Sequence, residues 1–347
     1  MPKLTVNDLN LQGKRVFTRV DYNVPMEESG STMVINDDTR IRATLPTLKA
    51  LIEKGARIVL AAHLGRPKGE RVASMSLRPV ADKLAELLEQ PVAFADDCVG
   101  EIVQVAINNL ENGEILLLEN VRYHSCEEAN GSDFAEQLAA HVDVFVNDAF
   151  GAAHRAHAST VGIAEVINAR GGQCAAGLLM ERELQFLGEE LDAPDKPFVV
   201  ILGGAKVSDK IKVIDRLIEK ADTVLIGGAM AYTLKLALGK SVGNSLVEPD
   251  KVDIAQAALD KAVERDVEFL LPNDNLISQM NDGEWANPVV NSAEDIPDGR
   301  EGVDIGPATA ARYAEAITGA KTILWNGPMG IFEDARFAKG TMAVAVA

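Results

Sequence analysis

The sequence is poor in cysteine, and its few cysteines are far apart. Cys98, Cys126 and Cys174 are the only three in 347 residues, and no CxxC pair occurs. An odd number at wide spacing argues against a disulfide framework and against a cysteine-based zinc site. A reduced, cytoplasmic setting is therefore expected.

Long apolar stretches are also absent. Residues 1–8 contain no apolar core of the kind that a secretion signal needs. No apolar run approaches about 20 residues, the length that crosses a bilayer. Low-complexity tracts and short repeats do not occur either. The sequence thus predicts a globular protein that does not bind membranes.

Positive charge is in the minority. Lys and Arg total 34 against 52 Asp and Glu, which gives a net charge of −18. Such an acidic protein is a poor general ligand for nucleic acid, so no nucleic-acid partner is expected. If it binds an anionic substrate, local clusters of Arg, Lys and His must form the site.

The common motifs of nucleotide-binding proteins are missing. Gly239, Lys240 and Ser241 imitate the end of a Walker A loop, but Leu234 stands where that loop needs glycine. Neither the GxGxxG fingerprint of dinucleotide-binding proteins nor the catalytic-loop motif of protein kinases occurs. Any nucleotide site must therefore be built from several separate loops.

Short apolar runs alternate with longer amphipathic stretches throughout the chain. Unbroken apolar strands between helices predict parallel sheets with helices on both faces. The expected strands are residues 15–24, 57–63, 114–119, 142–147, 198–202, 223–226, 268–271 and 322–325. The expected helices include residues 78–89, 133–141, 178–191, 208–220, 251–265, 308–317 and 336–347.

This alternation is interrupted once, at Ala-Arg-Gly-Gly in residues 169–172. The length suggests about two domains of ~150 residues. We therefore predict an α/β fold of two Rossmann-like lobes, each a parallel sheet covered by helices, joined by a helix and a hinge. The predicted boundaries are residues 1–172 for the first lobe, 173–192 for the interdomain helix and linker, and 193–347 for the second lobe.

Basic residues gather near the strand ends of the first lobe. Ligand sites in parallel sheets lie at the carboxyl ends of strands, and the guanidinium of Arg matches phosphate and carboxylate groups. Asp21 and Asn23 follow the first strand, where they fit either a plain turn or a hydroxylated ligand. The basic residues at or near four strand ends are Arg40, His63, Arg66, Arg122 and Arg155. They predict an anion-binding basin.

Glycine-rich turns follow the strands of the second lobe. Glycine lets backbone N–H groups approach a phosphate, and a helix N-terminus favours negative charge. Lys206 and Lys210 are four residues apart, so we expect both on one face of the first helical turn. The turns contain Gly203, Gly204 and Ala205, then Gly227 and Gly228, then Gly306, and finally Asn326 and Pro328. They predict one nucleotide cleft.

Segments of both lobes resemble the signature sequences of phosphoglycerate kinases. They are RVFTRVDYNVP at 15–25, HLGRP at 63–67, NDAFG with HRAH at 147–157, GGAKVSDK at 203–210 and WNGP at 325–328. The resemblance spans the chain in the family's order. It implies reversible phosphoryl transfer from 1,3-bisphosphoglycerate to ADP, giving 3-phosphoglycerate and ATP, by direct in-line transfer after the lobes close. It also implies a monomeric cytoplasmic enzyme of glycolysis that uses Mg²⁺ with ADP or ATP.

The resemblance also assigns roles to individual residues. Arg40 and Lys206 are the expected catalytic residues, because they would follow the phosphoryl group, and Glu333 would bind the ribose. Expected at the glycerate are Asp21, Tyr22, Asn23, Arg40, His63, Leu64, Gly65, Arg66, Arg122 and Arg155. Expected at the nucleotide are Gly203, Gly204, Ala205, Lys206, Lys210, Gly227, Gly228, Gly306, Asn326, Pro328 and Glu333.

The sequence departs from the family pattern in two places. Ala229 stands where the family commonly has a third glycine. The family also continues with a GGGD-type turn, whose Asp is expected to hold Mg²⁺, so no metal ligand is assigned here. Residues 336–347 predict a helix that ends without a Gly or Asn cap. From this we expect a longer chain, and in its absence weak nucleotide binding and poor transfer, with glycerate binding retained.

Two other functions share parts of this pattern. A dinucleotide-dependent dehydrogenase has the same α/β alternation, but its fingerprint is absent here. A sensor of sugar phosphates or nucleotides could use the fold without catalysis, since fold does not fix function. An absence of NAD binding would exclude the dehydrogenase, and turnover by the full-length protein would exclude the sensor.

Overall fold

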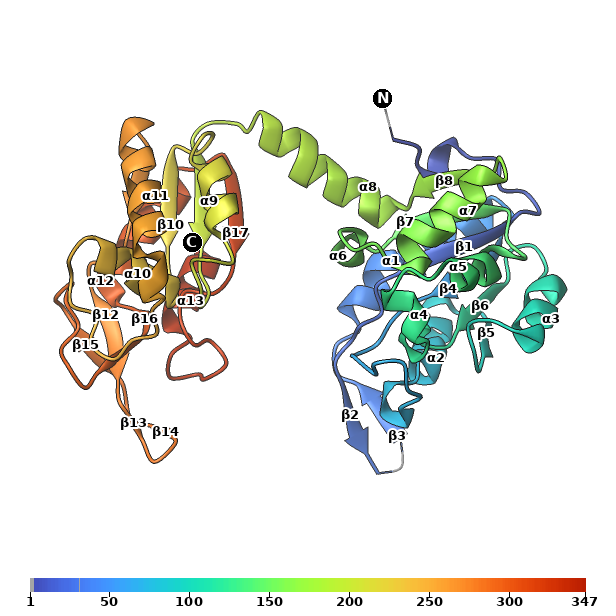
Figure 1. Ribbon diagram of the computed structural model, residues 1–347, viewed down its shortest axis with the longest axis horizontal. Helices are drawn as coiled ribbons and strands as arrows, with labels where there is room; N and C mark the ends of the chain where they lie inside the picture. Colours follow the sequence, from blue (N-terminus) through green and yellow to red (C-terminus); the bar gives the residue numbers. More distant parts are fainter. Residues whose placement is uncertain (1–2, 31) are drawn as a thin grey trace. The chain divides into compact units, whose positions relative to one another are not determined.

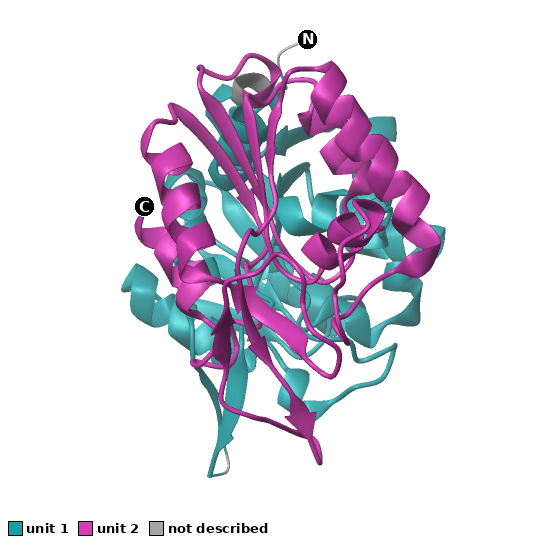
Figure 2. Cartoon of the chain, turned by 90° about the vertical axis from the view of Figure 1, so that its left-hand side faces the viewer, with its two compact units in different colours: residues 1–189 teal, residues 190–347 magenta. Residues whose placement is uncertain are grey.

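The computed structural model groups the chain into two compact units, residues 1–189 and 190–347, which Figure 2 shows in different colours. It describes residues 3–30 and 32–347, apart from the side chains of residues 189 and 190. The domain boundary that we placed at residue 172 stays a prediction. Each unit is described by itself below.

Unit 1 is built on a six-stranded sheet in which every strand pairing is parallel (Figure 1). The order across the sheet is β5-β6-β4-β1-β7-β8. Its strands are β1 (Arg15–Val20), β4 (Arg57–Ala61), β5 (Val92–Ala95), β6 (Ile115–Leu118), β7 (Val144–Asp148) and β8 (Gln173–Ala176). The central strands are mostly apolar because both faces of the sheet are covered, although β1 also contains Thr18 and Arg19.

Helices cover both faces of this sheet. Alternate strand residues pack against α1 (Thr39–Glu53), α2 (Arg78–Leu88) and α8 (Leu178–Leu184) on one face. The other face packs against α3 (Glu101–Asn109), α5 (Ser132–Ala139) and α7 (Ile163–Ala169). The remaining helices are the short α4 (Ser125–Glu128) and α6 (Phe150–Ala153).

A hairpin and several single turns complete unit 1. Strands β2 (Met26–Ser29) and β3 (Thr32–Ile35) pair antiparallel just before α1. After α8 the chain continues as a π-helix over Gln185–Glu190, so the predicted helix over 178–191 has two parts. The other turns are 3-10 helices at Val6–Asp8, Ala73–Met75 and Val121–Tyr123, and a π-helix at Ala158–Gly162.

Unit 2 contains a second parallel sheet, of order β11-β10-β9-β17. Its strands are β9 (Phe198–Leu202), β10 (Thr223–Ile226), β11 (Glu268–Leu270) and β17 (Thr322–Asn326). One face packs against α9 (Ile211–Leu217), α10 (Met230–Ala237) and α11 (Val252–Glu264), and the other against α12 (Pro307–Thr318) and α13 (Lys339–Val346). The prediction of an α/β fold with two helix-covered parallel sheets is confirmed.

Unit 2 also has antiparallel strands that we did not predict. Strands β15 (Val289–Asn291), β12 (Asn275–Ser278) and β16 (Glu301–Ile305) form a three-stranded sheet. Strands β13 (Met280–Asn281) and β14 (Glu284–Trp285) form a hairpin, and a 3-10 helix lies at Pro249–Lys251. In the described part of the chain, no helix has both the length and the apolar character needed to cross a membrane.

Candidate active site

Site residues that we predicted in unit 1, three basic and one acidic, follow four neighbouring strands. In the order β6-β4-β1-β7, these strands end before Arg122, His63, Asp21 and Arg155 respectively. Because the strands are parallel, their carboxyl ends meet at one edge of the sheet, where ligand sites form. The structure thus brings together the residues that we predicted, and we call them the basic cluster: Arg40, His63, Arg66, Arg122 and Arg155.

The loop after β1 is tied to two of its neighbours. Arg40 Nη1 donates to Asp21 Oδ2 at 2.8 Å, which holds the arginine at the start of α1 beside the strand end. Asn23 Oδ1 accepts the Gly65 N–H at 2.8 Å, which joins the β1 and β4 loops. Asp21 and Asn23 are half-buried, so each keeps part of its polar side chain accessible.

His63 is a buried imidazole among positive charges. Arg19, which is 1% exposed, places Nη2 3.1 Å from His63 Nδ1. Burial, together with the charges of Arg19, Arg122, Arg155 and Arg40, lowers the pKa of His63 to about 2. The ring is therefore neutral, and because Arg19 can only donate, Nδ1 accepts and Nε2 carries the proton.

Arg122 is held in place by the backbone of its neighbours. It is 6% exposed and donates to the Gly65 carbonyl at 2.9 Å, and Glu128 lies 3.1 Å from its Nε. Asn120 is fully buried, and its side chain bonds both Leu64 and the Arg122 N–H. Arg66 and Arg155 are exposed, so the cluster has both buried and exposed members.

Two predicted glycerate residues have buried side chains. Tyr22 is fully buried, and its hydroxyl lies 3.0 Å from Thr44 Oγ1. Leu64 is 5% exposed and belongs to the same apolar core as Val20. Their side chains pack in the core rather than in the basic cluster, so any ligand contact must come from their backbone.

The glycine turns of unit 2 follow three neighbouring parallel strands, in the order β10-β9-β17. They pack too closely for side chains. A Cβ on Gly228, whose φ is +66°, would lie 2.5 Å from the Gly204 backbone. A Cβ on Gly203 would lie 1.9 Å from the Pro328 carbonyl oxygen. Glycine is required here because the loops contact each other through their backbones.

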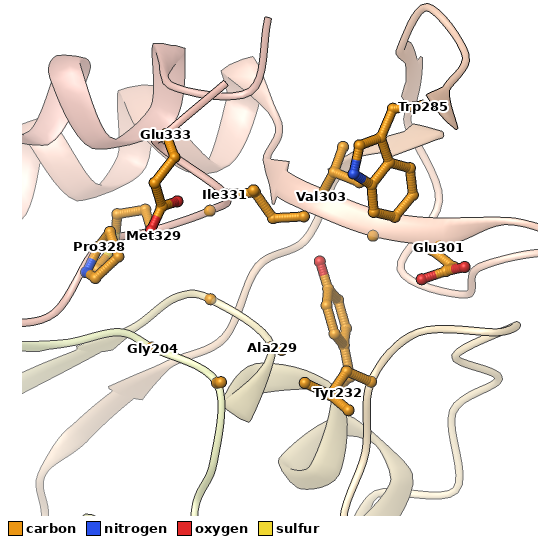
Figure 3. A pocket seen from close by; sticks show the side chains of 15 residues that line it. Gly204, Ala229, Tyr232, Trp285, Glu301, Val303, Pro328, Met329, Ile331 and Glu333 are labelled. Atoms are coloured by element: carbon orange, nitrogen blue, oxygen red, sulfur yellow. The ribbon is translucent and has the colours of Figure 1, made fainter. Parts of the chain in front are cut away.

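A cavity of about 360 Å³ opens beside these loops (Figure 3). Glu333 and Pro328 lie at one end of it, and Trp285 and Glu301 lie at the other. The lining comprises Gly204, Ala205, Gly228, Ala229, Tyr232, Leu246, Trp285, Glu301, Gly302, Val303, Pro328, Met329, Gly330, Ile331 and Glu333. Mostly apolar walls with a few polar groups suit a heterocyclic ring and its sugar.

The two lysines of the β9 loop do not lie on a helix, and this prediction was wrong. Helix α9 begins only at Ile211. Glu248 accepts from both the backbone and the hydroxyl of Ser208, which holds the preceding residues in a turn. Lys210 is half-buried and donates to the carbonyls of Gly203 and, at 3.0 Å, of Asn326. Lys206 is exposed and makes no hydrogen bond among the described residues.

Some predicted nucleotide residues lie outside the cavity lining. Gly306 precedes α12 as its N-cap, where a Cβ would lie 2.2 Å from the Asp274 carboxylate, and it lines a separate, more apolar cavity. Gly203, Gly227 and Asn326 support the turns: a Cβ on Gly227 would strike Met329, and the Asn326 carbonyl accepts the Gly203 N–H at 3.0 Å.

The sequence reasoning missed five residues that the structure places at or beneath these sites. Arg19 is a charged residue in an apolar strand, which was a usable signal. The other four residues gave no such signal in the sequence, because tertiary contacts bring them to these sites. The five residues are Arg19, Asn120, Tyr232, Trp285 and Glu301.

The family model that matches this chain is that of phosphoglycerate kinase, over residues 6–347. The phosphoglycerate kinase of Acidobacterium capsulatum is 52% identical, over 100% of this chain and 86% of the relative. That of Clostridium novyi is 50% identical, over 99% and 85%. Among solved structures, the phosphoglycerate kinase from Pyrococcus horikoshii matches with a TM-score of 0.83 at 34% identity, over 99% of this chain and 85% of that one.

Proposed function

The chain belongs to the phosphoglycerate kinase family, and from this premise we propose the reaction that its sites perform. It transfers a phosphoryl group reversibly between 1,3-bisphosphoglycerate and ADP, giving 3-phosphoglycerate and ATP, as a step of glycolysis. The observation that carries the proposal is the pairing of a basic cluster in unit 1 with a glycine-lined cavity in unit 2. The first suits a small phosphorylated acid and the second a nucleotide.

In unit 1 we assign the glycerate to the basic cluster. Arg66, Arg122 and Arg155 offer guanidinium donors to its phosphate, which is the geometry that Arg supplies best. Neutral His63 donates through Nε2, and the half-buried Asp21 and Asn23 bind the hydroxyl and carboxyl ends. Burial strengthens the hydrogen bonds that Arg122 and His63 donate, because water competes less for buried donors.

In unit 2 we assign the nucleotide to the cavity. Glu333, at one end, accepts from the ribose hydroxyls, and the apolar walls enclose the base. The glycine turns present backbone N–H groups to the phosphates. Lys210, at the centre of these turns, and the exposed Lys206 contribute positive charge.

The chemistry needs no protein nucleophile. Phosphoryl transfer depends on in-line positioning and on charge stabilisation, and a direct step between the two substrates supplies the rest. Arg40 and Lys206 stabilise the moving phosphoryl group, whose charge is largest in the transition state. Because the substrates bind to different units, we propose that the units close to bring them together and to exclude water.

We propose that Mg²⁺ enters with the nucleotide. This ion keeps several waters and binds through substrate phosphates with few protein ligands. Within residues 3–30 and 32–347, the one group of three potential ligands is Asp97, Cys98 and His124, and none of them lines the cavity. When bound, the ion neutralises phosphate charge, and the glycine turns hold the phosphates that carry it.

A coupled assay tests this function. The protein should form ATP from ADP and 1,3-bisphosphoglycerate only when both are present with Mg²⁺. Binding of either ligand without transfer would instead support the sensor. We further propose that the protein is cytoplasmic, because its three cysteines are free. We also propose that it is a monomer, which light scattering of the purified protein would check.

A further inference from the structure

A group of metal-ligating side chains lies in unit 1, outside the basic cluster. Asp97, Cys98 and His124 each offer one ligand atom, and these three atoms lie within 4.8 Å of one another. Strands β5 and β6 are parallel neighbours in which Ala95 pairs with Leu118, so the segments that follow them run side by side. The first segment carries Asp97 and Cys98, and the second leads to His124. The wide spacing of the cysteines argued against a zinc site, but here the fold brings together ligands that are distant in the sequence.

The oxygen and nitrogen ligands of this group are already oriented. His124 Nε2 lies 2.7 Å from Asp97 Oδ1, which also accepts the Cys98 N–H at 2.6 Å. The His124 ring stacks on Phe134, with the ring centroids 4.8 Å apart. The Asp97 side chain is 49% exposed and that of His124 is 30% exposed. Neighbouring contacts therefore hold both groups in place, and an ion can reach them from solvent.

Cys98 adds a buried thiol to this pair. It is 2% exposed, and its Sγ donates to the Glu119 carbonyl at 2.9 Å. Burial and the charges of Asp97, Glu119 and Glu127 raise the pKa of the thiol well above its ordinary value, against a smaller opposite effect of Arg71. These surroundings disfavour a thiolate by itself but favour a divalent cation, which balances the negative charge.

We propose that Asp97, Cys98 and His124 bind one Zn²⁺ ion, with water as the fourth ligand. Thiolate, imidazole and carboxylate are the ligands that Zn²⁺ takes in proteins, whereas Mg²⁺ prefers oxygen ligands alone. Two ligands of one tetrahedral zinc ion lie about 3.3–3.7 Å apart, so the side chains need to move by only roughly 1 Å. On binding, Cys98 releases its proton to solvent, and the proton of the His124 ring moves from Nε2 to Nδ1. The ion then joins the segment after β5 to the segment that carries Arg122.

The test is the binding of Zn²⁺ and Co²⁺ to the whole chain, freed of metal and without substrates. Calorimetry with a competing chelator should give one zinc ion per chain, and two buffers of different ionisation enthalpy should report about one proton released per ion at about pH 7.5. Co²⁺ should produce the near-ultraviolet charge-transfer band of a cobalt–thiolate bond, and Cys98→Ser should abolish it. Cys98→Ser and His124→Gln should each weaken zinc binding at least about 100-fold, since even the groups behind metal ligands contribute about 10- to 100-fold.

Cys126→Ser is the matched control, because Cys126 is also a free cysteine but is exposed and lies outside the group. It should keep both the cobalt band and the zinc affinity. His124→Gln changes a partly exposed side chain, so it decides the question even if Cys98→Ser does not fold. No zinc binding, an affinity unchanged in either variant, or a cobalt band that is lost in Cys126→Ser would overturn the inference. None of these measurements uses glycerate or nucleotide, so they test the zinc site separately from the proposed reaction.

Discussion

Arg40 forms an ion pair with Asp21, but the pair contributes little to stability. The arginine side chain is 51% exposed, and exposed pairs are worth roughly 0–1 kcal/mol. By contrast, Arg122 is 6% exposed and is bonded to the backbone of Gly65. Arg122 is therefore fixed in the fold, whereas Arg40 is accessible, and the roles that we propose are binding for Arg122 and catalysis for Arg40.

Replacing Arg40 with Ala should therefore lower kcat far more than it weakens glycerate binding. The charge that Arg40 stabilises develops in the transition state, and losing one such donor costs roughly 10²–10³ in rate. Steady-state kinetics would measure this, with Arg42→Ala as the control, because Arg42 is also exposed on α1 but pairs with Asp38. An unchanged kcat with a raised KM would make Arg40 an ordinary substrate anchor.

His63 predicts a specific effect of acid on stability. Its pKa of about 2 in the fold lies below the ordinary 6.5, so between these values only the unfolded chain binds the proton. The free energy of unfolding should then fall as pH drops below 6.5, by up to about 1.4 kcal/mol per pH unit. His63→Gln should lose less stability between pH 7 and pH 5, measured by urea unfolding. Equal losses in both proteins would show that His63 is not held neutral.

Among the elements of unit 2, three strand–turn units border the cavity that we propose as the nucleotide site, and their turns depend on glycine. Gly228→Ala places a Cβ 2.5 Å from the Gly204 backbone at a φ of +66°. We expect about 1–3 kcal/mol of lost stability and nucleotide binding weakened at least about tenfold. Gly239→Ala is the control: its φ is +73°, and nothing lies within 4 Å of the added Cβ. Equal nucleotide affinity in both variants, by calorimetry, would contradict the packing argument.

The parallel strands could be predicted from the sequence because both sheet faces are covered, which makes runs such as Phe198–Leu202 apolar throughout. The antiparallel sheet could not, because β12 and β16 are short, pair across 23 or more residues and contain a register shift. The predicted start of α9 at residue 208 was wrong because Ser208 donates to Glu248, 40 residues away in the sequence, and stays in a turn. Strand-end residues were predictable for the same reason as the strands. Glu301 reaches the cavity through this irregular sheet, and Trp285 reaches it through the β13–β14 hairpin, so neither was predictable.

At the scale of the whole molecule, each unit holds one half of the site that we propose. Under this proposal neither ligand alone connects the two units, whereas the two ligands together do. Small-angle scattering should therefore show a smaller radius of gyration only when 3-phosphoglycerate and nucleotide are both bound. The same radius in the free protein, with each ligand and with both, would contradict closure.

The central claim is that a phosphoryl group passes directly between a ligand of unit 1 and a ligand of unit 2. The most direct measurement follows labelled phosphate from the γ-position of ATP to 3-phosphoglycerate, at protein concentrations from catalytic to stoichiometric. We predict that label reaches the glycerate, that it needs Mg²⁺, and that Lys206→Ala slows its transfer without abolishing the binding of either ligand. Binding of both ligands with no transfer of label, even at stoichiometric protein, would contradict the account.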